Sequence, residues 1–576
     1  MDILFRVKEE EDPGQETAEG QKEFSITWPS GRTFKSLVDQ LPPKPSTDKD
    51  AFSPVMAVMI GGSLIGLNEE IPDDLPQTCP VELVRLSDME GYRIYVRTLI
   101  FLYTVCAKRV AGASRSVHIL HSINGSLYTE IRKEQEPVVM TMDQILKIRS
   151  MMQEMIDKDL PIRRVRKSMG SIREYFRSQE RTDLVYLSHF SVNEEGYLYQ
   201  LDGQWDTFNG LLMTSTGGLK WFDLVPYKEG IIIRTPDRSA PHDLRRYRPQ
   251  PRLFSAFTQS REWGQVAGVG NIGSLNMKVA SGQIDQLIDM SEALQSKHLA
   301  EISSQIAARK SRLVLIAGPS SSGKTTFAQK LCIQLMAEGL RPHMISMDNY
   351  FKNRDQQPTD ENGGSDFEGL DALDLDLFNQ DMSRIMKGQT IEIPTFNFLS
   401  GQREYNGRTL TLGSKDLLIV EGIHCLNEEV SRDVAQDQKF KIYISAITTL
   451  NLDDHNRIPT TDCRLLRRII RDNRHRGYSA AMTISRWESV RKGEEKNIFP
   501  FQEEADVFFN SALVYEPAVL KTYAEPLLFQ ITPDQPEYAE ARRLLKFLSM
   551  ILGAGSEHIP RTSLIREFIG GGIYHQ

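Results

Sequence analysis

Apolar runs alternate with helix-like patterns along the C-terminal half of the chain. Residues 313–317, 344–347, 417–420 and 440–444 are short apolar runs with the length and composition of buried strands. Between the first two runs, residues 327–337 space apolar side chains for a helix, and Gly339 is placed to end it. Strands that alternate with helices in this way predict an α/β fold with a mostly parallel sheet.

The N-terminal half has a different pattern. Residues 24–28 alternate polar and apolar side chains, and residues 55–60 form an apolar run that ends at two glycines, which predicts a small β-rich module. The apolar run 99–107 is about half a bilayer span, so we expect a buried helix and no membrane segment. Apolar residues recur at helical spacing over 142–167. Strand and turn patterns follow, so the middle region is predicted to be α+β.

A segment rich in proline and arginine follows the middle region. Residues 236–252 contain four prolines and five arginines, which predicts a surface connector without regular elements. Beyond Ser281, apolar residues at helical spacing predict one long lead-in helix. We therefore expect four parts along the chain, with boundaries at 1–88, 89–240, 241–310 and 311–576.

Composition limits the class of protein. A chain of 576 residues with 40% hydrophobic and 25% charged residues is expected to hold about three or four globular domains. Its net charge of −8 excludes binding to nucleic acid by bulk positive charge, so any site for a polyanion must be local. Five scattered cysteines without a C-x-x-C pair predict free thiols and a cytoplasmic location. The N-terminus meets acidic residues before any long apolar stretch, so we expect no secretory signal.

The most specific motif is a phosphate-binding loop between the first predicted strand of the α/β region and its helix. The segment Gly318-Pro-Ser-Ser-Ser-Gly-Lys-Thr-Thr326 satisfies G-x-x-x-x-G-K-[ST], and such a loop aims its backbone N–H groups at phosphate oxygens. Lys324 is expected to reach the β- and γ-phosphates of ATP, and Thr325 to hold Mg²⁺. The residues predicted to bind ATP here are Gly318, Ser320, Ser321, Ser322, Gly323, Lys324, Thr325 and Thr326.

Two acidic residues end predicted strands of the same region. Glu421 follows the apolar run 417–420 and is the candidate for orienting Mg²⁺, directly or through water. Asp348 lies just beyond the run 344–347. Because ligands of open α/β sheets collect beyond the carboxyl ends of the strands, Asp348 is placed to accept the proton of an acceptor hydroxyl.

A basic segment follows. Residues 464–476 contain six arginines and one aspartate, a local charge of +5. Arg464, Arg467, Arg468 and Arg471 are three or four residues apart, so on a helix they form one ridge that could clamp triphosphate oxygens as a closing lid. A solvated helix face or a nucleic-acid patch is the alternative interpretation.

Together these motifs resemble the uridine kinase and phosphoribulokinase family of P-loop kinases, over about residues 310–555. The supporting segments are GPSSSGKTT, SMDNYF (346–351), DFEGLDALD (366–374), IPTFNF (393–398), VEGIH (420–424) and the arginine segment. The resemblance implies Asp348 as general base and catalytic roles for Lys324 and Arg468, with Arg468 near the substrate. It implies Arg471 and Arg476 on ATP phosphates, and Phe351, Phe367, Glu368 and Phe396 around the acceptor.

The chain departs from that pattern where pyrimidine nucleoside kinases read the base. Gly401 occupies the position of a base-reading histidine, and Phe396-Asn397 replaces a Tyr-Asp pair. Glu368 stands for a shorter aspartate, and Tyr478 for an arginine. Kinase chemistry is therefore better supported than uridine as the substrate.

The N-terminal half resembles the front of threonyl-tRNA synthetase. The resemblance implies a TGS-like β-grasp module over 1–88 and a region like the second additional domain of the synthetase over 89–240. The segments that support it include 61–67, 121–128 and 221–225. The editing helix of the synthetase carries a histidine pair, whereas the segment RTLIFLYTV from Arg97 has none, and Val225 stands at the cysteine position. We expect no editing chemistry and no structural zinc, with structural or surface roles for His118 and His121.

The leading hypothesis is an ATP- and Mg²⁺-dependent kinase that phosphorylates a small-molecule acceptor, a uridine- or cytidine-like nucleoside or a related ribose-type compound. The alternative is an RNA-associated protein switched by ATP, suggested by the synthetase-like modules and by Arg163, Arg164, Arg166 and Lys167. A third hypothesis keeps the family but changes the acceptor to a sugar phosphate or a purine nucleoside. The sequence leaves the oligomeric state open, including a homo-oligomer.

Overall fold

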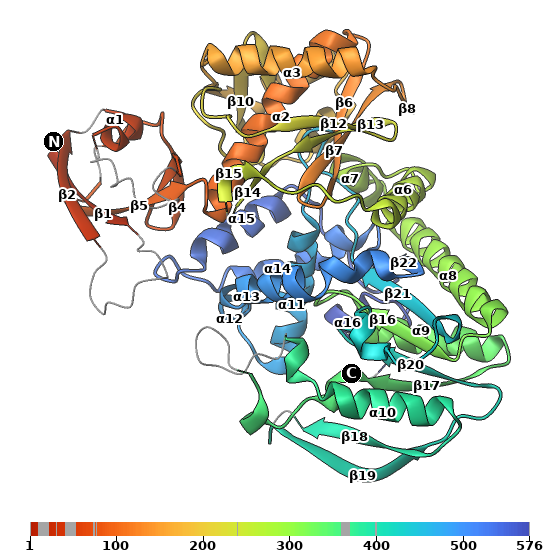
Figure 1. Cartoon of the computed structure of the whole chain (residues 1–576). Coiled ribbons are helices and arrows are strands. Elements are labelled where there is room, and N and C mark those ends of the chain that lie inside the picture. The colour runs from red at the N-terminus through yellow and green to blue at the C-terminus, as the bar shows by residue number, and fades with distance from the viewer. Residues whose placement is uncertain are drawn as a thin grey trace.

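The structure is a computed structural model and describes residues 2–9, 22–29, 32–40, 53–72, 75–76, 78–238, 240–358, 369–397 and 400–574. Figure 1 shows three regions: a small N-terminal sheet, an α+β region above, and a larger α/β region that contains the C-terminus. This multidomain arrangement of α+β and α/β parts agrees with the predicted fold class.

The described residues up to Arg85 contain one mixed sheet with the strand order β2-β1-β5-β3-β4. Strands β1 and β5 are parallel neighbours, and the other pairs are antiparallel. The elements are β1 (Asp2–Glu9), β2 (Lys22–Pro29), α1 (Phe34–Val38), β3 (Val55–Ile60), β4 (Ser63–Gly66) and β5 (Thr78–Arg85). The strands predicted at 24–28 and 55–60 are therefore confirmed.

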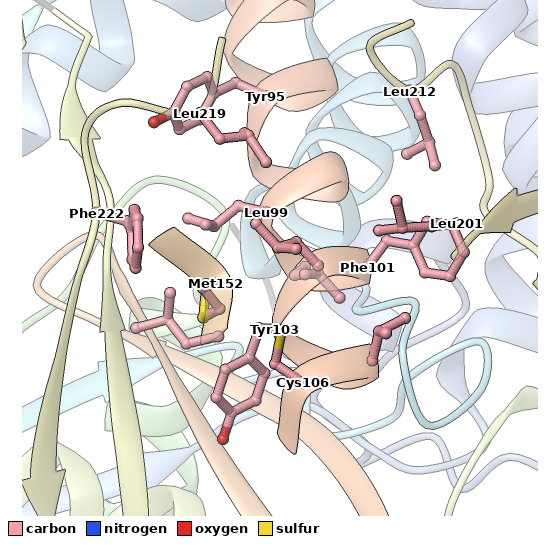
Figure 2. Close-up of a cluster of buried hydrophobic side chains, with 14 of the residues drawn as sticks. Tyr95, Leu99, Phe101, Tyr103, Cys106, Met152, Leu201, Leu212, Leu219 and Phe222 are labelled. Carbon is pink, nitrogen blue, oxygen red and sulfur yellow. The ribbon is translucent and has the colours of Figure 1, made fainter. Parts of the chain in front are cut away.

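The middle region is built around one long buried helix, α2 (Met89–Ala111). Figure 2 shows Leu99, Phe101 and Cys106 of this helix among apolar side chains of α3 and of the surrounding strands and loops. Because the helix is covered on several sides, its sequence is apolar all round, and the buried helix predicted for 99–107 is confirmed. Within the described part of the chain, no helix combines the length and hydropathy required to cross a bilayer.

Two antiparallel sheets flank this helix, with the orders β12-β13-β7-β6 and β11-β10-β9. The elements are β6 (Ser116–Ile123), β7 (Ser126–Lys133), β8 (Glu136–Pro137), α3 (Met142–Asp157), β9 (Arg163–Ser168), α4 (Met169–Ser178), α5 (Thr182–His189), β10 (Glu195–Leu201), β11 (Gln204–Asp206), β12 (Asp223–Tyr227) and β13 (Gly230–Arg234). The helical pattern predicted over 142–167 is only partly correct. The chain turns at Asp159, which has φ +47°, and Arg163 then begins a strand.

The segment 236–252 is also more regular than predicted. It contains the short strands β14 (Pro236–Asp237) and β15 (Ala240–Leu244), which pair as a hairpin. The helix α6 (Pro251–Val266) then begins with a proline at its first turn, where the missing N–H is not needed. Two more helices, α7 (Ile272–Ala280) and α8 (Ile284–Arg309), lead to the α/β region, and α8 confirms the predicted lead-in helix.

The C-terminal half contains a five-stranded sheet of order β17-β20-β16-β21-β22, and every neighbouring pair is parallel. The elements are β16 (Leu313–Ala317), α9 (Lys324–Ala337), β17 (Arg341–Ser346), α10 (Leu375–Met386), β18 (Ile391–Asn397), β19 (Gln402–Leu410), β20 (Asp416–Glu421), β21 (Lys439–Ser445), α11 (Thr460–Arg476), α12 (Ala480–Ser485), α13 (Trp487–Asn497), β22 (Val507–Asn510), α14 (Glu516–Leu528), α15 (Tyr538–Ser549) and α16 (Arg566–Ile569). The predicted parallel sheet is confirmed. Four of its strands match the predicted runs, and β22 was not predicted.

The middle region contacts the α/β region through residues 451–457, which we call the docking loop. This loop lies between β21 and α11, and the N–H group of Ile119 on β6 donates a hydrogen bond of 2.8 Å to the carbonyl oxygen of Asp454. The side-chain amide of Asn451 donates to the carbonyl oxygen of Ile119 at 2.7 Å. The Asp454 carboxylate also lies 3.2 Å from His118, and that of Asp453 lies 3.6 Å from Arg181. The two regions are therefore joined by buried polar contacts.

Candidate active site

The phosphate loop connects the fully buried strand β16 to helix α9, and two of its glycines are required by geometry. A Cβ atom at Gly318 would overlap the carbonyl oxygen of Ile444 at the end of β21. Gly323 has φ +86°, a left-handed conformation that favours glycine, and Ser321 shares it at φ +60°. The side chain of Lys324 folds back over the loop, and its Nζ atom donates to the Gly318 carbonyl oxygen at 3.0 Å. These contacts give the loop the shape that the motif predicts.

Two arginines of α11 support the loop from behind. Arg464 donates from Nε to the carbonyl oxygen of Ser320 at 3.0 Å, and Arg467 donates from Nη1 to that of Ser321 at 3.3 Å. Their side chains are 2% and 0% exposed and are paired with Glu494 and Glu516. The prediction that these two arginines belong to a closing lid is therefore wrong. Their guanidinium groups are already occupied by loop carbonyl oxygens and buried carboxylates.

The other arginines of α11 gather around one buried acid. The Asp472 carboxylate lies 3.2 Å from Arg468, 2.8 Å from Arg471 and 3.7 Å from Arg476. Arg468 also donates from Nη1 to the hydroxyl of Ser320 at 2.8 Å, which places this side chain against the phosphate loop. Burial, with the charge of Arg471, lowers the pKa of the Arg476 guanidinium. These three arginines remain candidates for contacts with phosphate or substrate.

The acidic residues predicted at strand ends lie at the carboxyl edge of the sheet. Glu421 pairs in register with Ile316 of β16 and with Ser346 of β17, and Asp348 follows β17 by two residues. Burial, together with the negative charge of Asp348, raises the pKa of Glu421 to about 7, while Lys324 acts in the opposite direction. Lys324, Asp348 and Glu421 are therefore close enough to interact electrostatically at the mouth of the loop.

Oxygen donors suited to Mg²⁺ meet at this edge. Thr325 lies in the first turn of α9, and the Glu421 carboxylate ends the neighbouring strand β20. Magnesium prefers such oxygen ligands and is usually held by one or two carboxylates plus phosphate oxygens and water. Among the described residues, no three His, Cys, Asp or Glu side chains are grouped to hold a metal alone. The donor set fits a magnesium ion shared with a nucleotide, where it would neutralise phosphate charge.

The raised pKa of Glu421 makes the effect of Glu421→Gln on stability dependent on pH. An acid with a raised pKa in the folded state destabilises the fold as the pH rises from its unfolded value towards 7. Without nucleotide or metal, the variant should therefore be more stable than the wild type at pH 8 by about 2 kcal/mol. This gain should shrink as the pH falls to 5. Thermal midpoints of the full chain at both pH values test this, with the exposed Glu557→Gln as control. A gain that did not depend on pH would contradict it.

The aromatic residues expected around the acceptor are only partly described. Phe351 and Phe396 are both buried, and their ring centroids lie 5.6 Å apart, so the structure brings these two together. They come from the end of the turn Met347–Tyr350 and from β18. Phe367 and Glu368 lie outside the described residues.

Gly401 occupies a tight turn between β18 and β19. Its φ is +69°, and a Cβ atom there would come within 2.8 Å of Arg354 Nε. The N–H group of Arg354 also donates to the Gly401 carbonyl oxygen at 2.8 Å. A histidine at this position would have to adopt a left-handed φ and displace the Arg354 side chain, so the departure from the pyrimidine kinases involves the turn as well as one side chain.

Sequence reasoning missed the acidic partners of the site. Glu494 accepts the N–H group of Ser320 at 3.0 Å, and Glu516 binds Arg467 at 2.7 Å. Glu567 accepts the N–H group of Thr326 at 3.3 Å. These residues lie far along the chain from the loop, and no local motif marks them.

The histidines and basic residues singled out in the N-terminal half are engaged in contacts within the protein. His118 Nε2 lies 2.7 Å from the hydroxyl of Ser116, and the ring of His121 stacks on Phe257 with centroids 4.1 Å apart. On β9, Arg164 pairs with Glu69 and Arg166 with Glu195, each at 2.6 Å. Arg163 and Lys167 are exposed. Half of this basic group is therefore neutralised by neighbouring acids.

A family of known kinases matches part of the C-terminal half. The family model "Phosphoribulokinase / Uridine kinase family" matches residues 313–515. A uridine kinase from Macrococcus caseolyticus (strain JCSC5402) is 31% identical over 199 residues, which are 34% of this chain and 87% of that protein. One from Staphylococcus aureus (strain JH9) is 31% identical over 196 residues, or 34% of this chain and 85% of that protein. The solved structure of a possible uridine kinase from Bacillus stearothermophilus is 17% identical, with a TM-score of 0.23, and the match covers 35% of this chain and 89% of that one.

Proposed function

Because the chain belongs to the phosphoribulokinase and uridine kinase family, we propose that it transfers the γ-phosphate of ATP to a hydroxyl of a nucleoside or a related ribose-type acceptor. Its enzyme class is a phosphotransferase with a hydroxyl acceptor, as in its relatives. The observation that carries the proposal is the convergence of Lys324, Asp348 and Glu421 at the mouth of one phosphate loop.

The proposed roles follow from the position of each group. The backbone of Ser320 to Thr326 and the ammonium group of Lys324 bind the phosphates of ATP. Asp348 accepts the proton of the acceptor hydroxyl as that oxygen attacks the γ-phosphorus. Arg468, which contacts Ser320 of the loop, stabilises the charge that develops on the transferred group. The hydroxyl of Thr325 and the carboxylate of Glu421 hold Mg²⁺.

The acceptor is proposed to be a ribose-type compound bound beside Phe351 and Phe396. Apolar rings suit the face of a base or a sugar, and Phe351 directly follows the turn Met347–Tyr350, which contains Asp348. A base-reading side chain at Gly401 would have to displace the side chain of Arg354. This supports a nucleoside read differently from uridine, or a sugar phosphate, as alternatives within the same reaction.

The N-terminal parts are proposed to be a TGS-like β-grasp module over 1–88 and a synthetase-like domain over 89–240 that lacks editing chemistry. The strand order β2-β1-β5-β3-β4, with β1 and β5 parallel, supports the first assignment. The burial of α2, which carries no histidine, supports the absence of a catalytic site on that helix. We do not propose RNA binding, because Arg164 and Arg166 are already paired with acids.

The test is the release of ADP by the full chain with ATP and Mg²⁺. Uridine, cytidine, purine nucleosides, free pentoses and phosphorylated sugars are each supplied as the acceptor. We expect one of these classes to raise ADP release well above the rate without acceptor, because an Asp348 base acts only when an acceptor hydroxyl is present.

The matched control is Lys324→Ala, which should lose the acceptor-dependent release. ADP release at the same rate with every acceptor and without any would contradict the proposal, since it would indicate a hydrolase. Phosphorylated product identified by mass would then name the substrate.

A further inference from the structure

The C-terminal segment 563–569 contacts the phosphate loop although it lies beyond the part of the chain that matches the kinase family. Ser563, Leu564, Ile565 and Phe568 are completely buried. The guanidinium group of Arg467, which supports the loop, lies over the ring of Phe568 at 4.8 Å from its centroid. This segment is therefore held against the arginine that supports the loop.

One side chain of this segment reaches the phosphate-binding groups themselves. Glu567 Oε2 accepts the N–H group of Thr326, the third residue of α9, at 3.3 Å. The first N–H groups of a helix have no partner within the helix, and Gly323 at the cap has no side chain to supply one. Glu567 supplies that missing acceptor. Its carboxylate also complements the positive end of the helix dipole.

A phosphate-binding loop uses these same N–H groups for its ligand. The backbone donors at the start of the helix cradle the α- and β-phosphates, so a carboxylate on Thr326 occupies a donor that a phosphate oxygen would take. The acids Asp348 and Glu421 already stand at the mouth of the loop, and a third negative charge there adds to the repulsion of a polyphosphate.

We propose that Glu567 is a built-in competitor for the phosphate site, which caps α9 when no nucleotide is bound and lowers the affinity for phosphorylated nucleotides. This inference rests on the proposed function, because it assumes that the loop binds ATP. The buried neighbours of Glu567 hold its backbone in place, so the side chain alone rotates away when the nucleotide enters. The C-terminal segment thereby raises the nucleotide concentration at which the phosphate site becomes half occupied.

The test is equilibrium binding of ATP, ADP and adenosine to the full chain, measured by calorimetry for the wild type, Glu567→Gln and Glu567→Ala. Both variants should bind ATP and ADP about tenfold more tightly, because a phosphate oxygen no longer has to displace the Glu567 carboxylate from the Thr326 N–H group. Adenosine has no phosphate and should bind equally to all three. Glu557→Gln removes an exposed charge ten residues before Glu567 and should change nothing.

Unchanged or weaker binding of ATP by both Glu567 variants would overturn the inference. Equal tightening of adenosine would overturn it as well, because it would assign Glu567 to the base and not to the phosphates. Lys324→Ala separates this result from a failure of the proposed function. If the wild type binds ATP and Lys324→Ala does not, the kinase proposal survives whatever Glu567 does; if no variant binds ATP, both proposals fail.

Discussion

Asp348→Asn should lower kcat by about 10²- to 10⁴-fold while ATP binding stays within a factor of about two, because the amide keeps the shape of the side chain but cannot accept a proton. Asp348 stands beyond β17, beside Lys324 and Glu421. Its role is therefore tested on turnover and on binding separately. Acceptor-dependent ADP release gives the first quantity, and calorimetry with ATP gives the second.

Lys324→Ala is the matched variant for this experiment. It removes the ammonium group that lies over the phosphate loop and should abolish measurable ATP binding. Both variants should keep the thermal midpoint of the wild type within a few degrees. Wild-type turnover by Asp348→Asn on the true acceptor would show that another group accepts the proton.

Arg467→Met should destabilise the chain by about 3–5 kcal/mol, because it leaves the Glu516 carboxylate buried without its partner. Arg467 is completely buried, and it also holds the carbonyl oxygens of Ser321 and Ser511. The loss should appear in the urea midpoint of the full chain and should be accompanied by weaker ATP binding, since the loop loses a support.

Two comparisons make this prediction specific. Arg542→Met replaces an exposed arginine of α15 and should cost under about 0.5 kcal/mol. Arg467→Met combined with Glu516→Leu should recover much of the loss, because removing both charges removes the unpaired one. Equal effects of Arg467→Met and Arg542→Met would contradict a structural role for the buried pair.

Short sequence patterns correctly predicted the buried strands, the phosphate loop and the acidic residues that follow the strands. The runs at 313–317 and 417–420 are strands β16 and β20, because a strand covered on both faces must be apolar throughout. The phosphate loop follows from its glycines. The same reasoning located Asp348 and Glu421, since both positions are defined by the strand that precedes them.

The spacing of residues along a helix predicts which side chains share a face, but not which part of the protein that face contacts. The spacing of Arg464 and Arg467 places them on one side of α11, but it does not say that this side packs against the loop and the acids Glu494 and Glu516. The arginine run predicts a lid that clamps phosphates, whereas Arg464 and Arg467 are buried against the loop and these two acids. Glu567 escaped notice for the same reason, because the loop it contacts lies 241 residues earlier in the chain.

The docking loop also restricts how this chain can be shortened. Asp454 depends on His118 and Asn456 on the carbonyl oxygen of Thr207, and both partners belong to the middle region. A protein truncated to its kinase half would lack these two partners. The side chains of Asp454 and Asn456, just before helix α11, would then lose these contacts. We therefore expect a chain shortened to its kinase half to be less stable than the full chain.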